Sequence, residues 1–178
     1  PKASLPTPYN LMLPRSHCPE CHQTISAFDN IPVLSFLLLK GRCRHCQVRI
    51  SWRYPLIEMI TALLSLAVAY HFGLTWQTLA ALLLTWSLMV LTLIDLQEQL
   101  LPDDITLPML WFGLLINTQS LFTSLQSAVV GAVVGYLFLW SVYWLFKLFT
   151  GKEGMGYGDF KLLAMLGAWF GWQALPVI

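Results

Sequence analysis

Charged side chains are scarce in this sequence. Asp, Glu, Lys and Arg make up 11% of its 178 residues, whereas an ordinary soluble domain contains roughly a quarter. Hydrophobic residues make up 57% of the chain. These proportions exclude a typical water-soluble globular domain and indicate a membrane protein.

The scarcity of charge begins near residue 55. Residues 55–178 contain ten charged side chains in 124 positions. The preceding segment holds seven of the ten basic residues: Lys2, Arg15, Lys40, Arg42, Arg44, Arg49 and Arg53. No repeat, coiled-coil heptad or signal peptide is recognisable. Because the sequence starts at Pro1 and stops within an apolar run, we expect a piece of a longer protein, with helices missing at both ends.

The apolar part predicts an all-α polytopic membrane protein, because a transmembrane helix needs about 20 mostly apolar residues. We expect about five such helices, at residues 55–72, 77–95, 105–122, 126–148 and 160–178. Gly131 and Gly135 predict a close-packing face on the fourth. Two domains follow: a small segment over 1–54 and a transmembrane domain over 55–178 that is incomplete at its C-terminus.

The loops predict the orientation of these helices. Cytoplasmic loops are enriched in Lys and Arg, and the connections near residues 73–76 and 122–126 contain neither. We therefore place residues 1–54, 95–104 and 147–159 in the cytoplasm.

All four cysteines occur in two C-x2-C pairs, Cys18/Cys21 and Cys43/Cys46, separated by 21 residues. This spacing is typical of four-thiolate zinc sites, which are closed and structural. A short segment with little core gains stability from such a metal. Paired disulfides and a redox or iron–sulfur role are the alternatives. His17, His22 and His45 are potential substitute ligands.

Two acidic residues lie at the predicted helix ends. Asp95 ends the second helix, and Asp159 begins the fifth within Gly-Tyr-Gly-Asp. Ionisable residues at such positions are costly and point to function. Paired carboxylates can act as general base and general acid, as in aspartic proteases. A proton or ion pathway, helix capping by Asp159, and Asp103 as a competing partner remain alternatives.

Taken together, these motifs resemble the bacterial type IV prepilin peptidases, also called leader peptidase/N-methyltransferases. The resemblance runs from about His17 to Trp172. It rests on the two cysteine pairs around Gly41-Arg42-Cys43 and on the segment from Ile50 to Glu58. It is completed by Leu93-Ile94-Asp95, which leads to Leu101-Pro102-Asp103, and by Gly156-Tyr157-Gly158-Asp159-Phe160-Lys161.

The resemblance implies a bifunctional GxGD-type aspartic protease of the bacterial inner membrane. Such enzymes cleave the leader of prepilins or type II secretion pseudopilins at the cytoplasmic face and methylate the new N-terminus with S-adenosylmethionine. Asp95 and Asp159 then match the catalytic acids, with Gly156, Gly158, Asp103 and Lys161 in substrate-binding or supporting roles. Cys18, Cys21, Cys43 and Cys46 match the zinc ligands, and Gly41 is a position on which methylation depends. The membrane lipid is a further partner, and a homodimer is compatible with this interpretation.

Two other functions compete with this one. A proton-coupled transporter would use Asp95 and Asp159 to carry protons, but it requires more polar residues deep in the helices than the sequence contains. A noncatalytic membrane scaffold built on the zinc segment leaves the Gly-Tyr-Gly-Asp motif unexplained. Nucleic-acid binding is not expected, because the basic residues are scattered and fit the topology rule.

Overall fold

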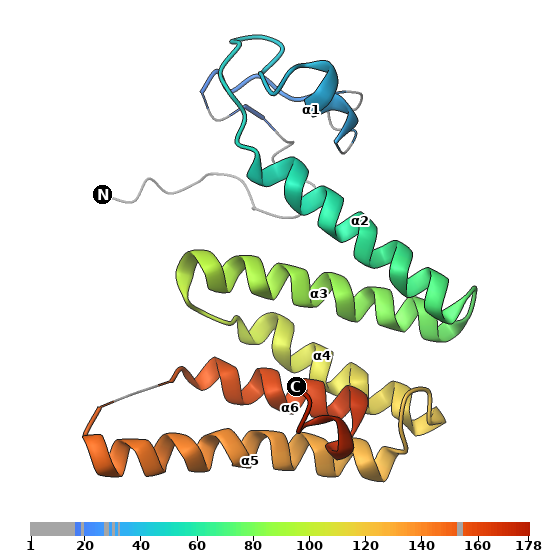
Figure 1. The fold of residues 1–178 in the computed structure, drawn as a ribbon, viewed down its shortest axis with the longest axis vertical. Helices are drawn as coiled ribbons and strands as arrows, with labels where there is room; N and C mark the ends of the chain where they lie inside the picture. Colours follow the sequence, from blue (N-terminus) through green and yellow to red (C-terminus); the bar gives the residue numbers. More distant parts are fainter. Residues whose placement is uncertain (1–16, 19, 27–28, 30, 32, 153–154) are drawn as a thin grey trace, which may run out of the picture. The chain divides into compact units, whose positions relative to one another are not determined.

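The computed structural model describes residues 17–18, 20–26, 29, 31, 33–152 and 155–178, and it is mainly helical. The chain divides into two compact units, with the division between Leu64 and Ser65. The elements follow in the order α1 (Leu34–Leu38), α2 (Arg53–Phe72), α3 (Trp76–Glu98), α4 (Asp103–Ile116), a 3₁₀ turn (Asn117–Gln119), α5 (Leu125–Thr150), α6 (Tyr157–Phe170) and a second 3₁₀ turn (Trp172–Ala174). Figure 1 shows this order in colour.

Three of the described helices, rather than the expected five, are long and apolar enough to cross a membrane. They are α2, α3 and α5, with 20, 23 and 26 residues. The helices α4 and α6 contain 14 residues each, which gives a length of about 21 Å, short of a hydrocarbon core of about 30 Å. The apolar composition that suggested five spans does not determine where a helix stops.

The two short helices end before the expected residues for local reasons. The predicted helix over 105–122 ends at Ile116, because the chain turns at Asn117 and Ser120 adopts a left-handed φ of 52°. The predicted helix over 160–178 ends at Phe170, because Gly171 takes a φ of 83°. A side chain at Gly171 would also collide with the Ser127 hydroxyl.

Asn117 is fully buried and joins the ends of α4 and α6. Its amide nitrogen donates to the carbonyl oxygens of Ala168 and Trp169, at 2.9 and 3.0 Å. Its side-chain oxygen accepts the backbone N–H groups of Phe122 and Thr123. Every donor and acceptor of this amide therefore has a partner, as burial in an apolar interior requires.

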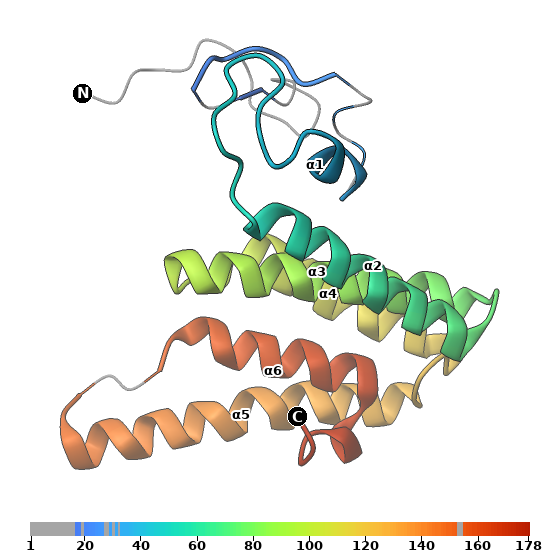
Figure 2. The same ribbon diagram turned by 45° about the horizontal axis from the view of Figure 1, so that its top comes forward.

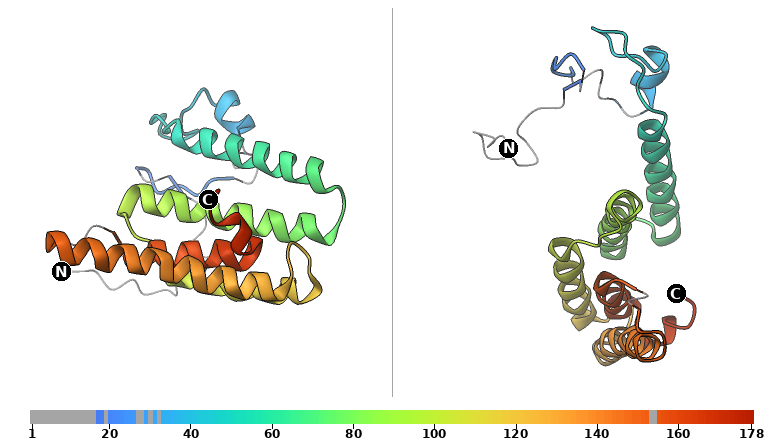
Figure 3. Two further views of the ribbon diagram at one scale, coloured as in Figure 1. Left: turned by 60° about the horizontal axis from the view of Figure 1, so that its bottom comes forward. Right: turned by 90° about the vertical axis from the view of Figure 1, so that its left-hand side faces the viewer.

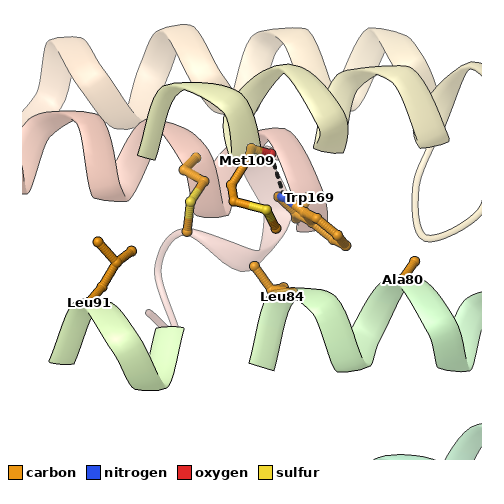
Figure 4. Packing of buried hydrophobic residues seen from close by; sticks show 6 residues of the cluster. Ala80, Leu84, Leu91, Met109 and Trp169 are labelled. Atoms are coloured by element: carbon orange, nitrogen blue, oxygen red, sulfur yellow. Dashed lines mark hydrogen bonds between the residues drawn. The ribbon is translucent and has the colours of Figure 1, made fainter. Parts of the chain in front are cut away.

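The second unit is built around α6, which lies between α4 and α5 when the helices are viewed end-on (Figure 3, right). The hydrophobic core joins three helices and is formed by Ala80, Leu84 and Leu91 of α3, Met109 of α4, and Met165 and Trp169 of α6. Figure 4 shows Trp169 of this core next to Met109, with the indole N–H donating to the Met109 carbonyl oxygen at 2.8 Å.

The helices α5 and α6 run side by side in opposite directions (Figures 1 and 2). Gly131 and Gly167 face each other so closely that a methyl group on either would overlap the backbone of the other. A Cβ atom at Gly135 would lie 2.8 Å from the Leu163 carbonyl oxygen. The close-packing face predicted from Gly131 and Gly135 is confirmed, and its partner is the helix that carries Asp159.

Substitution of Gly167 by Ala is expected to destabilise the second unit. The added methyl group meets the backbone of Gly131, which cannot rotate away as a side chain can, and overpacking of this kind costs about 1–3 kcal/mol. Thermal unfolding of the purified protein in detergent measures the loss as a lower midpoint. Val133→Ala on the exposed side of α5 is the matched control, and an equal shift in both variants would contradict the close contact.

Candidate active site and metal centre

Asp95 lies in the last turn of α3, which continues three residues beyond the predicted end. The helix terminates at Gln99, whose left-handed backbone, with a φ of 52°, directs its N–H to the Asp95 carbonyl oxygen at 2.8 Å. The Asp95 side chain is exposed. The backbone of this residue therefore closes the helix, while its carboxylate remains available at the surface.

Asp159 lies in the first turn of α6. The helix begins after Gly156, and no side chain caps its N-terminus by a hydrogen bond. The Asp159 side chain is half-buried, and the next residue, Phe160, is completely buried between α5 and α6. Because no capping bond occupies the Asp159 carboxylate, hydrogen-bonded helix capping does not explain its presence.

The fold brings the C-terminal end of α3 and the N-terminal end of α6 to the same end of the second unit (Figures 1 and 2). Gly158 contacts the connection between α3 and α4, because a Cβ atom at this glycine would lie 2.8 Å from the Leu101 Cβ atom. Within the described residues, neither Asp95 nor Asp159 forms a side-chain hydrogen bond or ion pair. Among the described residues, both carboxylates are therefore without a partner.

Asp103 and Lys161 are also brought together, across 58 residues of sequence. The Lys161 ammonium lies 2.7 and 2.6 Å from the two carboxylate oxygens of Asp103. This ion pair joins the first turn of α4 to the first turns of α6. The Asp103 carboxylate is therefore paired with a cation. In this it differs from the carboxylates of Asp95 and Asp159, which have no partner among the described residues.

The four cysteines form two backbone turns with the same bonding pattern. In each turn, the first cysteine donates its N–H to the carbonyl five residues later, and the residue four positions later donates back to the cysteine carbonyl. The bonds are Cys18 N to Gln23 O at 3.0 Å, His22 N to Cys18 O at 2.9 Å, Cys43 N to Val48 O at 2.9 Å, and Gln47 N to Cys43 O at 3.1 Å. Each turn thereby directs two sulfur atoms to one point.

The four sulfur atoms lie within 4.8 Å of one another. Cys18 and Cys46 are 3.7 Å apart, and Cys21 and Cys43 are 4.0 Å apart. Zn–S bonds of about 2.3 Å in a tetrahedron place sulfur atoms about 3.8 Å apart. The cluster therefore has the ligands and size for a metal ion, and no histidine among the described residues belongs to it.

All four thiols are free, so the predicted alternative of paired disulfides does not describe this structure. The backbone N–H groups of Cys46 and His45 donate to the Cys43 sulfur and lower the pKa of this thiol to about 6. The Val48 N–H acts in the same direction on Cys46, but desolvation and the three neighbouring sulfurs raise its pKa to about 12. A cation between the sulfurs is what would allow all four to ionise together.

Gly41 lies between the second cysteine turn and α1. Its φ of 68° is in the left-handed region, and a Cβ atom would approach the Phe36 ring to 2.9 Å. The Gly41 carbonyl oxygen accepts the Ile50 N–H at 2.8 Å. Both the backbone angle and the ring contact favour glycine at this position.

Two contacts of the first unit were not anticipated from the sequence. The Glu58 carboxylate of α2 accepts the backbone N–H of Val33 at 2.7 Å. Arg44 forms a bidentate ion pair with Asp29, with bonds of 2.6 to 3.1 Å, and this guanidinium lowers the pKa of the Asp29 carboxyl. A glutamate within an otherwise apolar helix was the only available signal for the first contact.

Two family models match the chain. The bacterial peptidase A24 N-terminal domain matches residues 3–72, and the type IV leader peptidase family matches residues 82–178. No solved structure shows a significant match.

Several curated relatives bear the name prepilin leader peptidase/N-methyltransferase. The protein of Aeromonas hydrophila is 66% identical over 171 residues, which cover 96% of this chain and 59% of the relative. That of Pseudomonas aeruginosa is 62% identical, covering 95% and 58%. That of Burkholderia pseudomallei strain K96243 is 52% identical, covering 98% and 56%. The chain thus spans less than three fifths of the length of these relatives. Its match to the second family model, over more than half of its residues, shows that it belongs to the type IV leader peptidase family.

Proposed function

We propose that this chain is the larger part of a membrane-embedded aspartic endopeptidase that removes leader peptides from type IV prepilins or type II secretion pseudopilins. The observation that carries the proposal is the pair of unpartnered carboxylates, Asp95 and Asp159, at one end of the second unit of a type IV leader peptidase family member. One carboxylate would activate a water molecule as general base, while the other would protonate the leaving amine.

The proposed location is the bacterial inner membrane, with the catalytic end and the zinc segment in the cytoplasm. If the apolar helices α2 and α3 both cross the membrane, the end of α3 that carries Asp95 would return to the cytoplasmic side. Residues 1–54 form the zinc segment in this proposal, and residues 55–178 form the protease domain. To make up the expected five spans, α4 and α6 would both have to cross the membrane in addition to α2, α3 and α5.

The metal in the cysteine cluster is proposed to be a structural Zn²⁺. Four thiolates leave no open coordination position, so the ion would stabilise the segment and take no part in bond cleavage. Methylation of the new N-terminus is proposed as a second activity, with S-adenosylmethionine as methyl donor and Gly41 as a position on which the activity depends. The described residues form no Gly-rich strand-to-helix turn of the kind that holds nucleotide cofactors, so no donor-binding residues are assigned.

The direct test is cleavage of a synthetic peptide with a basic leader, a glycine and an apolar segment by the full-length protein in detergent. Mass spectrometry is expected to show one cut, after the glycine, and the gain of one methyl group on the apolar product when S-adenosylmethionine is present. An intact peptide in the presence of folded protein would overturn the proposed peptidase. Proton flux into vesicles containing the protein would then test the transporter alternative.

The ion pair between Asp103 and Lys161 is proposed to position Asp159. Asp103→Asn and Lys161→Met are each expected to lower kcat about tenfold with a smaller change in KM, because a displacement of about 1 Å at a catalytic group can cost about 100-fold. The double variant Asp103→Lys with Lys161→Asp restores the pair with reversed charge.

Rescue of kcat by this double variant is the expected result, measured on the same peptide. If Asp103→Asn instead removes all cleavage and the reversed pair fails to rescue it, Asp103 belongs to the catalytic pair.

A further inference from the structure

The short helix α1 presents an apolar surface within the first unit. Leu34, Leu37 and Leu38 are 54%, 62% and 75% exposed. Two aromatic residues just before and at the start of α2 are exposed as well, Trp52 at 73% and Tyr54 at 65%. Single exposed apolar residues are ordinary, but several of them on one short helix and at the adjoining start of α2 indicate a site of interaction.

The helix α1 is fixed to the beginning of α2 by two contacts. The Val33 N–H, at the start of α1, donates to the Glu58 carboxylate at 2.7 Å. The Phe36 ring packs edge-on against the Trp52 ring, with centroids 4.7 Å apart. The exposed leucines therefore move with the first two turns of α2.

These contacts set the depth of α1 in a bilayer, provided that α2 crosses the membrane as proposed. Glu58 lies five residues beyond Arg53, which is about 7.5 Å along the helix axis. The polar region on each side of a bilayer is about 5–8 Å thick. With Arg53 placed at the outer edge of the headgroup region, the start of α1 lies where headgroups meet the acyl chains, and Trp52 and Tyr54 lie at the headgroup level, where such side chains are enriched.

Basic side chains accompany this apolar surface. Lys40, Arg42, Arg49 and Arg53 are exposed, and none forms an ion pair within the described residues. Arg42 and Arg49 lie opposite each other in an antiparallel bridge. Arg44 differs from them, because its charge is already balanced by Asp29. Unpaired cations in the same short segment as exposed leucines suit a surface of anionic headgroups above acyl chains.

We infer that Leu34, Leu37, Leu38, Trp52 and Tyr54, with Lys40, Arg42, Arg49 and Arg53, form a docking surface for an anionic phospholipid bilayer. The leucines enter the boundary between headgroups and acyl chains, and the four basic side chains contact lipid phosphates. The zinc segment is then held against the membrane at a fixed depth. In this arrangement, the Glu58 carboxylate accepts the hydrogen bond of the Val33 N–H at the start of α1, where bulk water is not available to accept it.

Hydrogen exchange of the full-length protein in nanodiscs tests the inference. Amides of residues 33–41 are expected to exchange about tenfold more slowly in nanodiscs containing phosphatidylglycerol than in phosphatidylcholine alone, because basic residues near an anionic surface strengthen its binding. Leu37→Ser with Leu38→Ser should remove protection in both lipids. Arg42→Gln with Arg49→Gln should remove only the dependence on phosphatidylglycerol, while Arg44→Gln, the matched control, retains it.

A crosslinking arm identifies what covers the surface. With p-benzoylphenylalanine in place of Leu38, light is expected to produce lipid adducts. Adducts to a polypeptide, or exchange rates that are equal in both lipids and in all variants, would overturn the inference. Peptide cleavage is measured on the same samples, because its absence beside intact lipid-dependent protection would reject the proposed peptidase and leave the docking surface standing.

Discussion

Asparagine in place of Asp95 or Asp159 is expected to lower the rate of leader cleavage about a thousandfold or more, because general acid–base catalysis contributes about 10²–10⁴-fold. Asparagine has nearly the same size as aspartate but neither accepts nor releases a proton. Neither side chain has a partner among the described residues, so the exchange leaves no broken ion pair. The measurement is the cleavage rate of the prepilin peptide by each full-length variant.

Asp104→Asn is the matched control, since Asp104 is an exposed acid in the first turn of α4 and belongs to neither proposed role. It should cleave at the wild-type rate. The two catalytic changes combined should be little worse than one alone, because residues that act as a unit have non-additive effects. Normal cleavage by either single variant, with normal membrane insertion, would show that the acid concerned is structural.

Loss of the metal is expected to unfold the zinc segment. Among the described residues before α2, only Cys18 and Phe36 are buried hydrophobic side chains, so this segment has almost no core of its own. Zinc binding supplies about 10–16 kcal/mol of folding free energy in small four-ligand sites. Cys43→Ser should therefore reduce zinc content from about one ion per chain to almost none and abolish amide protection over residues 18–50.

His45→Gln is the control for this variant, because it lies between Arg44 and Cys46 but its ring is not part of the cysteine cluster. Zinc is measured by atomic emission of the purified full-length protein, and protection by hydrogen exchange. Peptide cleavage should remain measurable in Cys43→Ser, since both proposed catalytic acids belong to the other unit. A wild-type protein without zinc, or full zinc content in Cys43→Ser, would contradict the proposed metal site.

The sequence was sufficient to predict the helices that are fixed by apolar length, but not the ends of the short ones. The starts of α2 to α6 lie within three residues of the predicted starts. The chain leaves α6 at Gly171, and the last carbonyls of α6 are satisfied by Asn117 at the end of α4, which lies 51 and 52 residues away in the sequence. Local periodicity carries no information about such a partner, so both helices were predicted too long.

The same distinction applies to the site. The cysteine cluster could be predicted from the spacing of the cysteines. Each C-x2-C turn is a local feature of the sequence, and only the convergence of the two turns joins residues far apart. The Asp103–Lys161 pair and the Val33–Glu58 bond were not expected, since they join residues 58 and 25 positions apart. The catalytic roles of Asp95 and Asp159 stay predictions, supported by their position at a common end of the helices.

The buried amide of Asn117 has a consequence for the opposite end of α6. A slip of one residue along this helix would turn every side chain through about 100° and shift it by about 1.5 Å. The bonds from Asn117 to the last turn of α6, and the salt link of Lys161 near its first turn, oppose both movements. The Asn117 amide thereby helps to set the angle of the Asp159 carboxylate, although it binds the helix more than two turns away.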